Sequence, residues 1–537
     1  MPEELPVEKK QRSKSFIEST FVLVLANAIV KVMGACFSIP LTNLIGGDGN
    51  GIFTVAYYIY TALYVIATAG LPVAVSKMVA EANALGRAKQ VRQTFRVALL
   101  TFLVIGSVGT GVMMLGARFF TRIIGNTMAY QAVLAIAPSI FFVSVVSAIR
   151  GYYQGLSDMV PTAFSQLIEA LGKLGCGLLL TWVLIEKGYP LETVVAGSIS
   201  GVTIGTVLSA LYMIAVRARD KRVLDNSGDT GVLTQPKDTF KKLVNIAVPV
   251  TIGSSVMSLT NLIDMGVVMN RLQDAGMTEV EANFIYGCYS MAVKLFNLPQ
   301  TLIVAISISV IPTIAAAYVR KNIPLANRTT ETAFRLTALM AMPCAVGLAV
   351  LAEPILGLLY FNIPDEVAIA APLLRIISPA VLMVGLVSVV NALLQGMGRE
   401  RIPVITMLCG GVVKLVANYI MVGNPAINIH GAPVSTTLCY STIAILGMIV
   451  IHRQGIRISY FRVFGKPFIS AAVMGVFAWL AFGPVSALLG AKLGCLVTVG
   501  LSAVIYLLML IATKALPKED VLMMPKGAKI AKLLRIE

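Results

Sequence analysis

Long apolar stretches, separated by short polar and charged ones, dominate this sequence. Fourteen of the apolar stretches are long enough to cross a hydrocarbon core of about 30 Å, which takes about 20 helical residues. They lie at residues 16–45, 52–79, 95–116, 129–155, 160–185, 193–216, 240–270, 282–319, 330–358, 367–397, 402–423, 430–451, 467–484 and 490–513. Because a helix satisfies its own backbone hydrogen bonds in lipid, the pattern predicts an all-α polytopic membrane protein with about 14 transmembrane helices.

The apolar pattern is duplicated at an offset of about 240 residues. Ala137-Pro138 and Gln154-Gly155 recur as Ser378-Pro379 and Gln395-Gly396, with the same proline-to-glutamine spacing. Parallel duplication of a six-helix block builds the two lobes of many transporters around a central substrate path. We therefore expect two six-helix lobes related by an internal repeat, and the duplication points to transport.

Polar and charged segments divide the predicted chain into six parts. Two helices near the C-terminus lie outside the repeat, and a polar linker separates the lobes. The parts are a cytoplasmic N-terminal segment (1–15), an N-lobe with helices 1–6 (16–222), a cytoplasmic linker (223–238), a C-lobe with helices 7–12 (239–455), two additional helices (456–514) and a basic cytoplasmic tail (515–537).

Composition and the placement of charge set the environment and orientation of these helices. Of the 537 residues, 57% are hydrophobic and 13% are charged, far below the roughly 25% charged residues of soluble proteins. The formal net charge is +17, and the basic residues gather in alternate loops, such as 217–222 and 453–466; the opposite loops carry little beyond Arg118, Arg122 and Lys187. The positive-inside rule then places both termini in the cytoplasm. Since topology explains the basic charge, we expect no nucleic-acid partner.

Catalytic and metal-binding patterns are absent from the sequence. The seven cysteines are scattered without a pairwise motif, and the two histidines, His430 and His452, have no metal-ligand partner at a useful spacing. The sequence lacks the Gly-rich loop ending in Lys-Ser/Thr that binds nucleotide phosphates after a strand. We therefore do not expect this chain to hydrolyse ATP. The sequence predicts a protein that is not an enzyme, with no cofactor and no metal.

Ionisable residues inside the predicted spans need an explanation, because each costs about 2.5–3.5 kcal/mol at mid-bilayer unless it has a partner or faces water. Six lie deep in a span: Lys31, Glu169, Lys173, Asp264, Lys294 and Lys414. Structural ion pairs between helices and the lining of a water-filled cavity are the two explanations. Lys77 and Arg150 lie nearer the cytoplasmic ends, where a long side chain can reach the interface.

The positions of these charges favour an anionic substrate. Glu169 and Lys173 are four residues apart in the favourable Glu-then-Lys order, so they can pair along one helix face. Lys173 and Lys414 each lie nineteen residues after the glutamine of their Gln-Gly motif, so the repeat would place both at the lobe interface. Four interior lysines and two interior acids suit an anionic head group better than a cationic drug.

Several of these segments resemble a known family. Arg150-Gly151-Tyr152-Tyr153-Gln154-Gly155, continuing through residues 159–166 to Glu169, resembles the signature of the SpoVB/YtgP-type flippases, which are relatives of MurJ in the multidrug/oligosaccharidyl-lipid/polysaccharide (MOP) exporter superfamily. Residues 72–77 and 294–299 also resemble that group, and the resemblance covers essentially the whole chain. It implies a MATE/MOP-like fold and the movement of lipid-linked saccharides across a membrane.

The resemblance also implies roles for individual residues. In MurJ-type proteins, cationic residues line a central cavity that receives a lipid pyrophosphate, and Lys31 and Lys294 fall where that family has arginines. The chain departs from the family elsewhere. Phe37 and Ser38 stand at the positions of an Arg-Asp pair, and a second-helix arginine of the family falls near Tyr64.

Asp264 is expected to pair within the second lobe with Lys414 and Asn418. Some relatives hold a sodium ion between a seventh-helix acid and polar residues four apart on the eleventh helix, and Lys414 and Asn418 have that separation. The ammonium of Lys414 would then take the place of the metal, because an unpaired carboxylate at this depth is costly.

We therefore predict a flippase that moves an undecaprenyl-pyrophosphate-linked saccharide, with the peptidoglycan precursor lipid II as the leading substrate, across the bacterial cytoplasmic membrane by alternating access. The predicted substrate-binding residues are Lys31, Lys173, Lys294, Lys414 and Arg150, and the predicted charge-pairing or coupling residues are Asp264, Asn418 and Glu169. The expected partners are the lipid-linked saccharide, membrane lipids and cell-wall synthesis enzymes, and the chain is expected to be monomeric.

Three alternatives stay open at this point. One is a cation-coupled multidrug exporter on the same fold, because a fold does not determine a function. Another is a transporter of a different lipid-linked polysaccharide repeat unit. The third is a non-transporting membrane scaffold that recruits cell-wall enzymes through its basic loops, and such a scaffold would be indifferent to loss of the intramembrane lysines.

Overall fold

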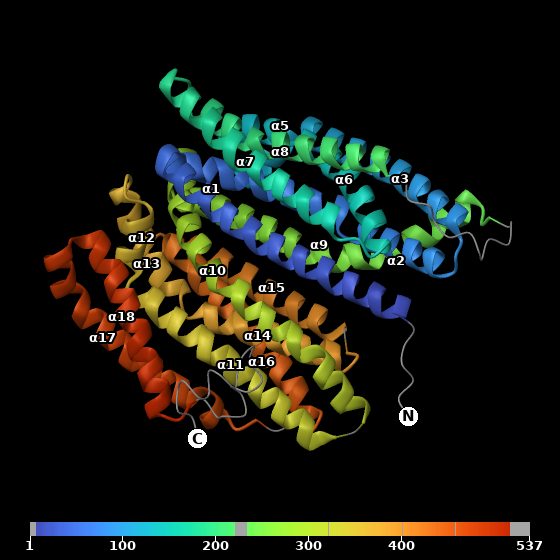
Figure 1. The fold of residues 1–537 in the computed structure, drawn as a ribbon. Helices are drawn as coiled ribbons and strands as arrows, with labels where there is room; N and C mark the ends of the chain where they lie inside the picture. Colours follow the sequence, from blue (N-terminus) through green and yellow to red (C-terminus); the bar gives the residue numbers. More distant parts are fainter. Residues whose placement is uncertain (1–6, 221–232, 321, 400, 457, 516–537) are drawn as a thin grey trace. The chain divides into compact units, whose positions relative to one another are not determined.

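The computed structural model describes residues 7–220, 233–320, 322–399, 401–456 and 458–515, and within these ranges the chain is all helical (Figure 1). Its elements are α-helices joined by short connections, with two single 3₁₀ turns and one π-helical segment. Residues 7–15 of the predicted N-terminal segment (1–15) belong to α1. Most of the linker at 223–238 and nearly all of the tail at 515–537 lie outside the described residues.

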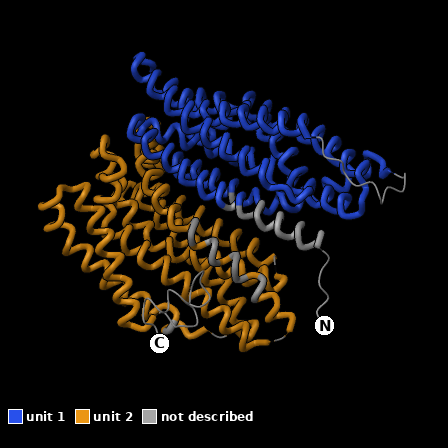
Figure 2. The backbone as a smooth tube through the Cα atoms, viewed as in Figure 1, with its two compact units in different colours: residues 1–270 blue, residues 271–537 orange. Residues whose placement is uncertain are grey.

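The chain divides into two compact units, residues 1–270 and 271–537 (Figure 2). Unit 1 contains α1 (Val7–Thr68), α2 (Gly70–Ala84), α3 (Ala88–Leu115), α4 (Ala117–Ile124), η1 (Thr127–Ala129), α5 (Tyr130–Ile136), α6 (Pro138–Gly155), α7 (Val160–Glu186), α8 (Leu191–Arg219) and most of α9 (Pro236–Asp274). Unit 2 contains the end of α9, α10 (Glu279–Val319), α11 (Ile323–Val350), α12 (Ala352–Leu359), α13 (Pro364–Ile377), α14 (Ala380–Gly396), α15 (Arg401–Val422), η2 (Asn428–His430), α16 (Gly431–Arg453), η3 (Phe461–Gly465), α17 (Lys466–Leu489) and α18 (Ala491–Ala512).

The boundary between the units lies inside α9, and α9 packs with unit 1 up to residue 270. Lys242 of α9 forms an ion pair with Glu81 of α2, with 2.8 Å between Nζ and Oε2. The side-chain amide of Asn270 donates to the carbonyl of Ile123 at the end of α4. The expected division into lobes at the linker 223–238 therefore stays a prediction.

Eleven helices among the described residues are long and apolar enough to cross a membrane, or up to twelve if the bent pair α13–α14 is one span. The structure thus confirms an all-helical polytopic membrane protein, while the number fourteen stays a prediction. The count treats α1 and α2 as one stretch, Leu25–Ala84. That stretch is longer than one crossing of about 30 Å requires.

Helix α1 folds back on itself at Gly46. The rings of Phe37 and Phe53 lie 6.0 Å apart between centroids, although a straight helix would separate residues sixteen positions apart by roughly 24 Å. Gly46 makes the reversal with φ 66° and ψ −169°, a conformation that glycine adopts readily because it has no Cβ. The predicted span at 16–45 therefore lies in the first arm of this hairpin, and residues 52–68 of the predicted span at 52–79 lie in the second arm.

The duplicated motifs take the same places in the two units, which confirms the internal repeat. In unit 1, α5 meets α6 at Ala137-Pro138, and α6 ends at Gln154-Gly155. In unit 2, α13 meets α14 at Ser378-Pro379 with a bend of 45°, and α14 ends at Gln395-Gly396. Proline has no backbone N–H to donate, so a new helix starts at each motif.

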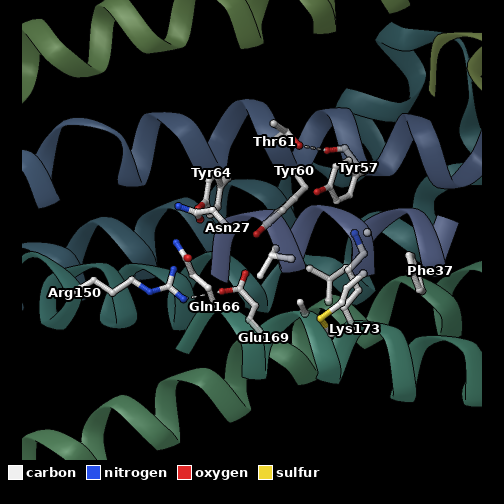
Figure 3. Close-up of a pocket in the computed structure, with 15 residues that line it drawn as sticks. Asn27, Phe37, Tyr57, Tyr60, Thr61, Tyr64, Arg150, Gln166, Glu169 and Lys173 are labelled. Carbon is white, nitrogen blue, oxygen red and sulfur yellow. Dashed lines mark hydrogen bonds and ion pairs between the residues drawn. The ribbon is translucent and has the colours of Figure 1, made fainter. Parts of the chain in front are cut away.

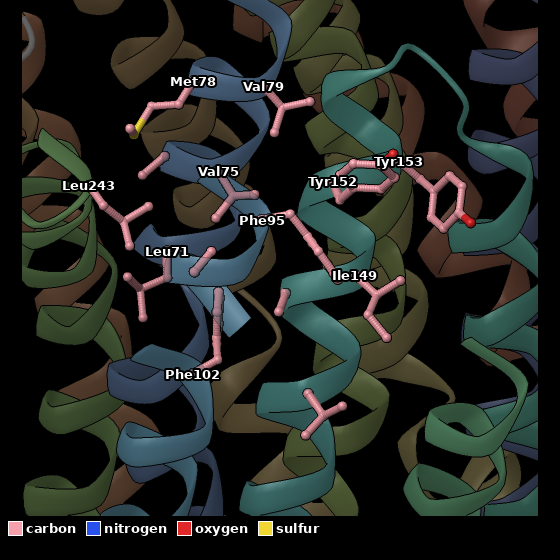
Figure 4. Packing of buried hydrophobic residues seen from close by; sticks show 14 of the residues in the cluster. Leu71, Val75, Met78, Val79, Phe95, Phe102, Ile149, Tyr152, Tyr153 and Leu243 are labelled. Carbon is pink, nitrogen blue, oxygen red and sulfur yellow. The ribbon is translucent and has the colours of Figure 1, made fainter. Parts of the chain in front are cut away.

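The core of unit 1 lies where α2, α3, α6 and α9 meet (Figure 4). Its buried side chains include Val75, Phe95, Ile149, Tyr152 and Leu243, which come from all four helices. In lipid, helices associate mainly through close packing, so complementary surfaces of this kind hold the bundle together. This core holds the second half of α6 against α2 and α3.

The two helices outside the repeat, α17 and α18, pack on α11 within unit 2. Met342 of α11, Met474 of α17 and Tyr506 of α18 share one buried cluster. The hydroxyl of Tyr506 donates to the backbone carbonyl of Leu339 at 2.8 Å, which satisfies a polar group that is buried among apolar ones.

Candidate functional site

A cavity of about 320 Å³ lies within unit 1 between α1, α6, α7 and α8 (Figure 3). Both arms of the α1 hairpin contribute to it, because the reversal at Gly46 brings residues 27–37 and 57–64 to the same space. The lining residues are Asn27, Val30, Met33, Gly34, Phe37, Tyr57, Tyr60, Thr61, Tyr64, Arg150, Gln166, Glu169, Ala170, Lys173 and Val202. A mostly apolar wall with a few converging polar groups is typical of a ligand site.

Arg150 and Glu169 form an ion pair at one end of the cavity. The Nη2 of Arg150 lies 3.0 Å from Oε2 of Glu169, and their side chains are 11% and 26% exposed. The same guanidinium donates from Nε to Oγ of Ser165 at 2.8 Å and from Nη2 to Oγ of Ser209 at 3.4 Å. Arg150 therefore joins α6 to α7 and α8. Its guanidinium is held inside unit 1, so the side chain does not reach out to the membrane interface. Its predicted role in substrate binding stays a prediction.

Lys173 is held by aromatic rings. Its ammonium lies 4.9 Å from the ring centroids of both Phe37 and Tyr57, which come from different arms of α1. Such cation–π contacts are stabilising, more so where water is excluded. In the described part of the chain, the partner of Glu169 is Arg150, so the expected pair between Glu169 and Lys173 is not formed. The guanidinium of Arg150 reaches the carboxylate from the neighbouring helix α6. The spacing of residues along α7 alone cannot predict such a contact between helices.

The cavity has a net positive charge. Its lining contains two cations, Arg150 and Lys173, and one carboxylate, Glu169, so the sum is +1. The charge of Arg150 is balanced by Glu169, whereas the rings around Lys173 stabilise its ammonium without neutralising it. An anionic group that entered the cavity could bind the ammonium of Lys173 without displacing a carboxylate from it.

The glycines of α8 allow α7, the helix that carries Glu169 and Lys173, to pack closely against α8. A Cβ added to Gly205 would lie 2.4 Å from the backbone carbonyl oxygen of Glu169, and one added to Gly201 would lie 2.5 Å from Cα of Gly177. Only small residues allow two helix backbones to approach this closely. Substitution of Gly205 would therefore displace the turn of α7 that carries Glu169.

A row of tyrosines also lines the cavity, and the sequence reasoning missed it. Tyr57, Tyr60 and Tyr64 lie on one face of the second arm of α1, with ring centroids 5.9 Å and 5.5 Å apart along the row. The signal in the sequence was the spacing of three and four residues, which also fits ordinary core packing. Only the structure shows that this face meets a polar cavity.

The remaining predicted site residues lie elsewhere. Lys31 is an exposed residue of α1 between Asn27 and Gly34, but it is not one of the lining residues. Lys294 on α10 and Lys414 with Asn418 on α15 belong to unit 2, and Asp264 lies on the part of α9 in unit 1. Asn418 is buried and accepts a hydrogen bond from the Ser435 hydroxyl of α16. The grouping of Asp264 with Lys414 and Asn418 stays a prediction.

The described residues contain no cluster of three or more His, Cys, Asp and Glu side chains that could hold a metal ion. The polar groups of the cavity are instead an ion pair, an ammonium, hydroxyls and amides. This set suits the binding of a polar or anionic ligand.

The arrangement of helices matches those of two solved membrane transporters. The chain aligns with the structure of lipid II flippase MurJ in an inward closed conformation with a TM-score of 0.69 and 14% identity, covering 91% of this chain and 98% of that one. It aligns with an inward-facing multidrug resistance MATE family transporter with a TM-score of 0.63 and 15% identity, covering 79% and 98%. These two comparisons show that the chain has the same helical membrane fold as those two proteins.

The chain belongs to the polysaccharide biosynthesis protein family, whose model matches residues 16–318, and it is a SpoVB/MurJ-type flippase of the MOP superfamily. The MatE family model matches residues 249–420. Among curated proteins, the chain is 26% identical to lipid II flippase MurJ of Bacillus subtilis over 460 residues, 82% of this chain and 83% of that protein. It is 24% identical to stage V sporulation protein B of the same organism over 526 residues, 95% and 98%.

Proposed function

We propose that this chain moves an undecaprenyl-pyrophosphate-linked saccharide, with lipid II as its substrate, across the cytoplasmic membrane of a bacterium by alternating access. Both termini would lie in the cytoplasm, as the basic loops indicate. The observation that carries the proposal is the cavity of unit 1 with its net positive lining and its ring-held Lys173.

The physical argument starts from the cost of moving a pyrophosphate through hydrocarbon. A charged group at the bilayer centre is costly unless it is paired or in a polar cavity. A cavity inside the helical bundle can take the charged head group while the polyprenyl tail stays in lipid. Lys173 supplies a compact cation for phosphate, and Arg150 lines the same cavity, paired with Glu169 about one helical turn before Lys173 on α7.

The other predicted cations have supporting roles in this proposal. Lys31 and Lys294 would contact the pyrophosphate as it enters or leaves, since both hold positions where MurJ-type proteins carry arginine. Lys414 would balance Asp264, with Asn418 as a further partner. These assignments rest on the family resemblance.

The proposal is tested by complementation of a bacterium depleted of its lipid II flippase. Cells that express the chain should export lipid II, whereas cells that express Lys173→Ala should accumulate inward-facing lipid II at equal membrane levels of the protein. Lys187→Ala is the matched control, because Lys187 is an exposed residue that follows α7 and does not line the cavity. Accumulation of inward-facing lipid II in cells with the unaltered chain would exclude lipid II as the substrate.

The same assay distinguishes the alternatives. A multidrug exporter, which the MatE match to residues 249–420 favours, would protect cells against cationic drugs and leave lipid II unmoved. Such an exporter needs a carboxylate that is open to a cation, yet Glu169 is occupied by Arg150. A scaffold for cell-wall enzymes would be unaffected by Lys173→Ala.

A further inference from the structure

The cavity of unit 1 has two chemically different ends. At one end, the second arm of α1 presents Tyr57 and α7 presents Lys173, with the ammonium over the tyrosine ring. At the other end, the same arm presents Tyr64 and α7 presents Gln166 (Figure 3). The separation is seven residues on both helices, or roughly 10 Å along each axis.

Gln166 lacks a hydrogen bond at its acceptor atom. Its Oε1 is buried, and no donor contacts it in the part of the chain that the structure describes. Buried side-chain oxygens are usually hydrogen-bonded, so an unpartnered one that lines a cavity is an acceptor open to a donor from water or from a ligand. Asn27, on the first arm of α1, adds a second amide to the same cavity.

The tyrosine row supplies a flat apolar surface beside these amides. Tyr60 and Tyr64 have ring centroids 5.5 Å apart, and both line the cavity. A pyranose ring has apolar C–H faces and polar edges. Its faces can pack against aromatic rings, and its hydroxyl or acetamido groups can bond to amide side chains, which offer both donors and acceptors. Arg150 lies near Gln166 (Figure 3), but Glu169 balances its charge. Rings and amides together therefore match a sugar better than they match a lipid tail or a second phosphate.

We propose that Tyr60, Tyr64, Gln166 and Asn27 form a subsite for the first sugar of the head group, next to a phosphate subsite at Lys173. The inference rests on the proposed transport of a lipid pyrophosphate. A sugar joined to a phosphate at Lys173 would extend along α1 and α7 toward Gln166, and one of its O–H or N–H groups would donate to Oε1 of Gln166. The cavity would thus distinguish a loaded carrier lipid from the bare one.

The test compares three lipids with the purified full chain in nanodiscs. They are undecaprenyl pyrophosphate, the same lipid with one 2-acetamido-2-deoxyhexose, and the same lipid with one plain hexose. We expect the unaltered chain to bind at least one sugar-bearing lipid about tenfold more tightly than the bare lipid, as one satisfied buried acceptor would give. Gln166→Leu should abolish this advantage without changing the affinity for the bare lipid.

Matched variants separate recognition from damage to the fold. Gln131→Leu changes an exposed glutamine of α5 outside the cavity and should keep the advantage. Tyr64→Phe retains the ring and should keep most of it, whereas Tyr64→Leu should lose it. An advantage for the acetamido sugar alone identifies an amide N–H as the donor to Gln166, and an equal advantage for both sugars identifies a hydroxyl.

The outcomes distinguish the subsite from the transport proposal. If Gln166→Leu and Tyr64→Leu both keep the full preference for a sugar-bearing lipid, or if the unaltered chain shows no preference while binding the bare lipid, the sugar subsite is wrong and phosphate binding stands. If the unaltered chain binds none of the three lipids, the proposed function itself is wrong.

Discussion

Removing one member of the Arg150–Glu169 pair should destabilise unit 1 far more than removing both. With side chains 11% and 26% exposed, either charge left alone would be largely cut off from water. A buried pair that loses one partner costs about 3–5 kcal/mol, and the partial exposure of Glu169 places this pair near the lower end, at about 3 kcal/mol. Arg150→Met and Glu169→Met should each lower the free energy of unfolding by that amount.

The double variant discriminates between a coupled pair and two independent contributions. Two apolar side chains of similar size leave no unpaired charge, so Arg150→Met with Glu169→Met should cost about 1 kcal/mol or less, well below either single variant and far below their sum of about 6 kcal/mol. Ser165 and Ser209 keep partners in that variant, because their hydroxyls also donate to backbone carbonyls. The measurement is unfolding in mixed detergent micelles, followed by the circular dichroism of the helices.

An exposed ion pair of the same unit provides the control. Lys242 and Glu81 lie 2.8 Å apart, but their side chains are 56% and 43% exposed. Exposed pairs are worth about 0–1 kcal/mol, so Lys242→Met should have little effect. Equal losses at the two sites, or a double variant at the sum of the single ones, would refute the view that burial makes the Arg150 pair matter.

Three other predictions address packing, binding and coupling. Gly205→Ala should lower both the thermal stability of the protein and lipid export, because the new Cβ would lie 2.4 Å from the carbonyl oxygen of Glu169 on α7. Gly175→Ala is the control and should leave both measurements unchanged, because a Cβ there would meet no atom within 4 Å. Lys31→Ala with Lys294→Ala should abolish lipid export at normal membrane levels, with partial activity retained by the Arg variants; full activity of the double Ala variant would remove both from the site. Lys414→Ala should destabilise the protein or make transport sodium-dependent, and normal export without new sodium or pH dependence would show that it does not balance a carboxylate.

Much of the fold could be predicted from the sequence because periodicity and duplication are properties of single segments. The apolar stretches, the duplicated proline-to-glutamine motif and the separate arms of α1 all follow from local patterns. The partner of Glu169 could not be predicted in that way. The spacing of Glu169 and Lys173 fits a pair on one helix, and nothing local reveals that Arg150 arrives from α6.

The sugar-facing surface was hidden for a related reason. Tyr57, Tyr60 and Tyr64 have the spacing of a core-facing stripe, and the sequence does not say whether such a stripe meets other apolar side chains or a polar cavity. Gln166 lies in the segment that resembles the family signature, but nothing in that pattern gives its side chain a role. Its importance depends on an atom that lacks a partner, which only the packed structure shows.

The aromatic seat of Lys173 has a consequence for how far its charge is felt. A carboxylate partner would turn the ammonium into a short dipole whose field falls away within a few ångströms, whereas the rings of Phe37 and Tyr57 leave the full positive charge in place. Low-dielectric walls then channel that field along the cavity toward its opening, where it can draw anions from a distance set by the Debye length of about 8 Å in physiological salt. The association rate of an anionic head group should therefore fall as ionic strength rises, while its dissociation rate should change far less.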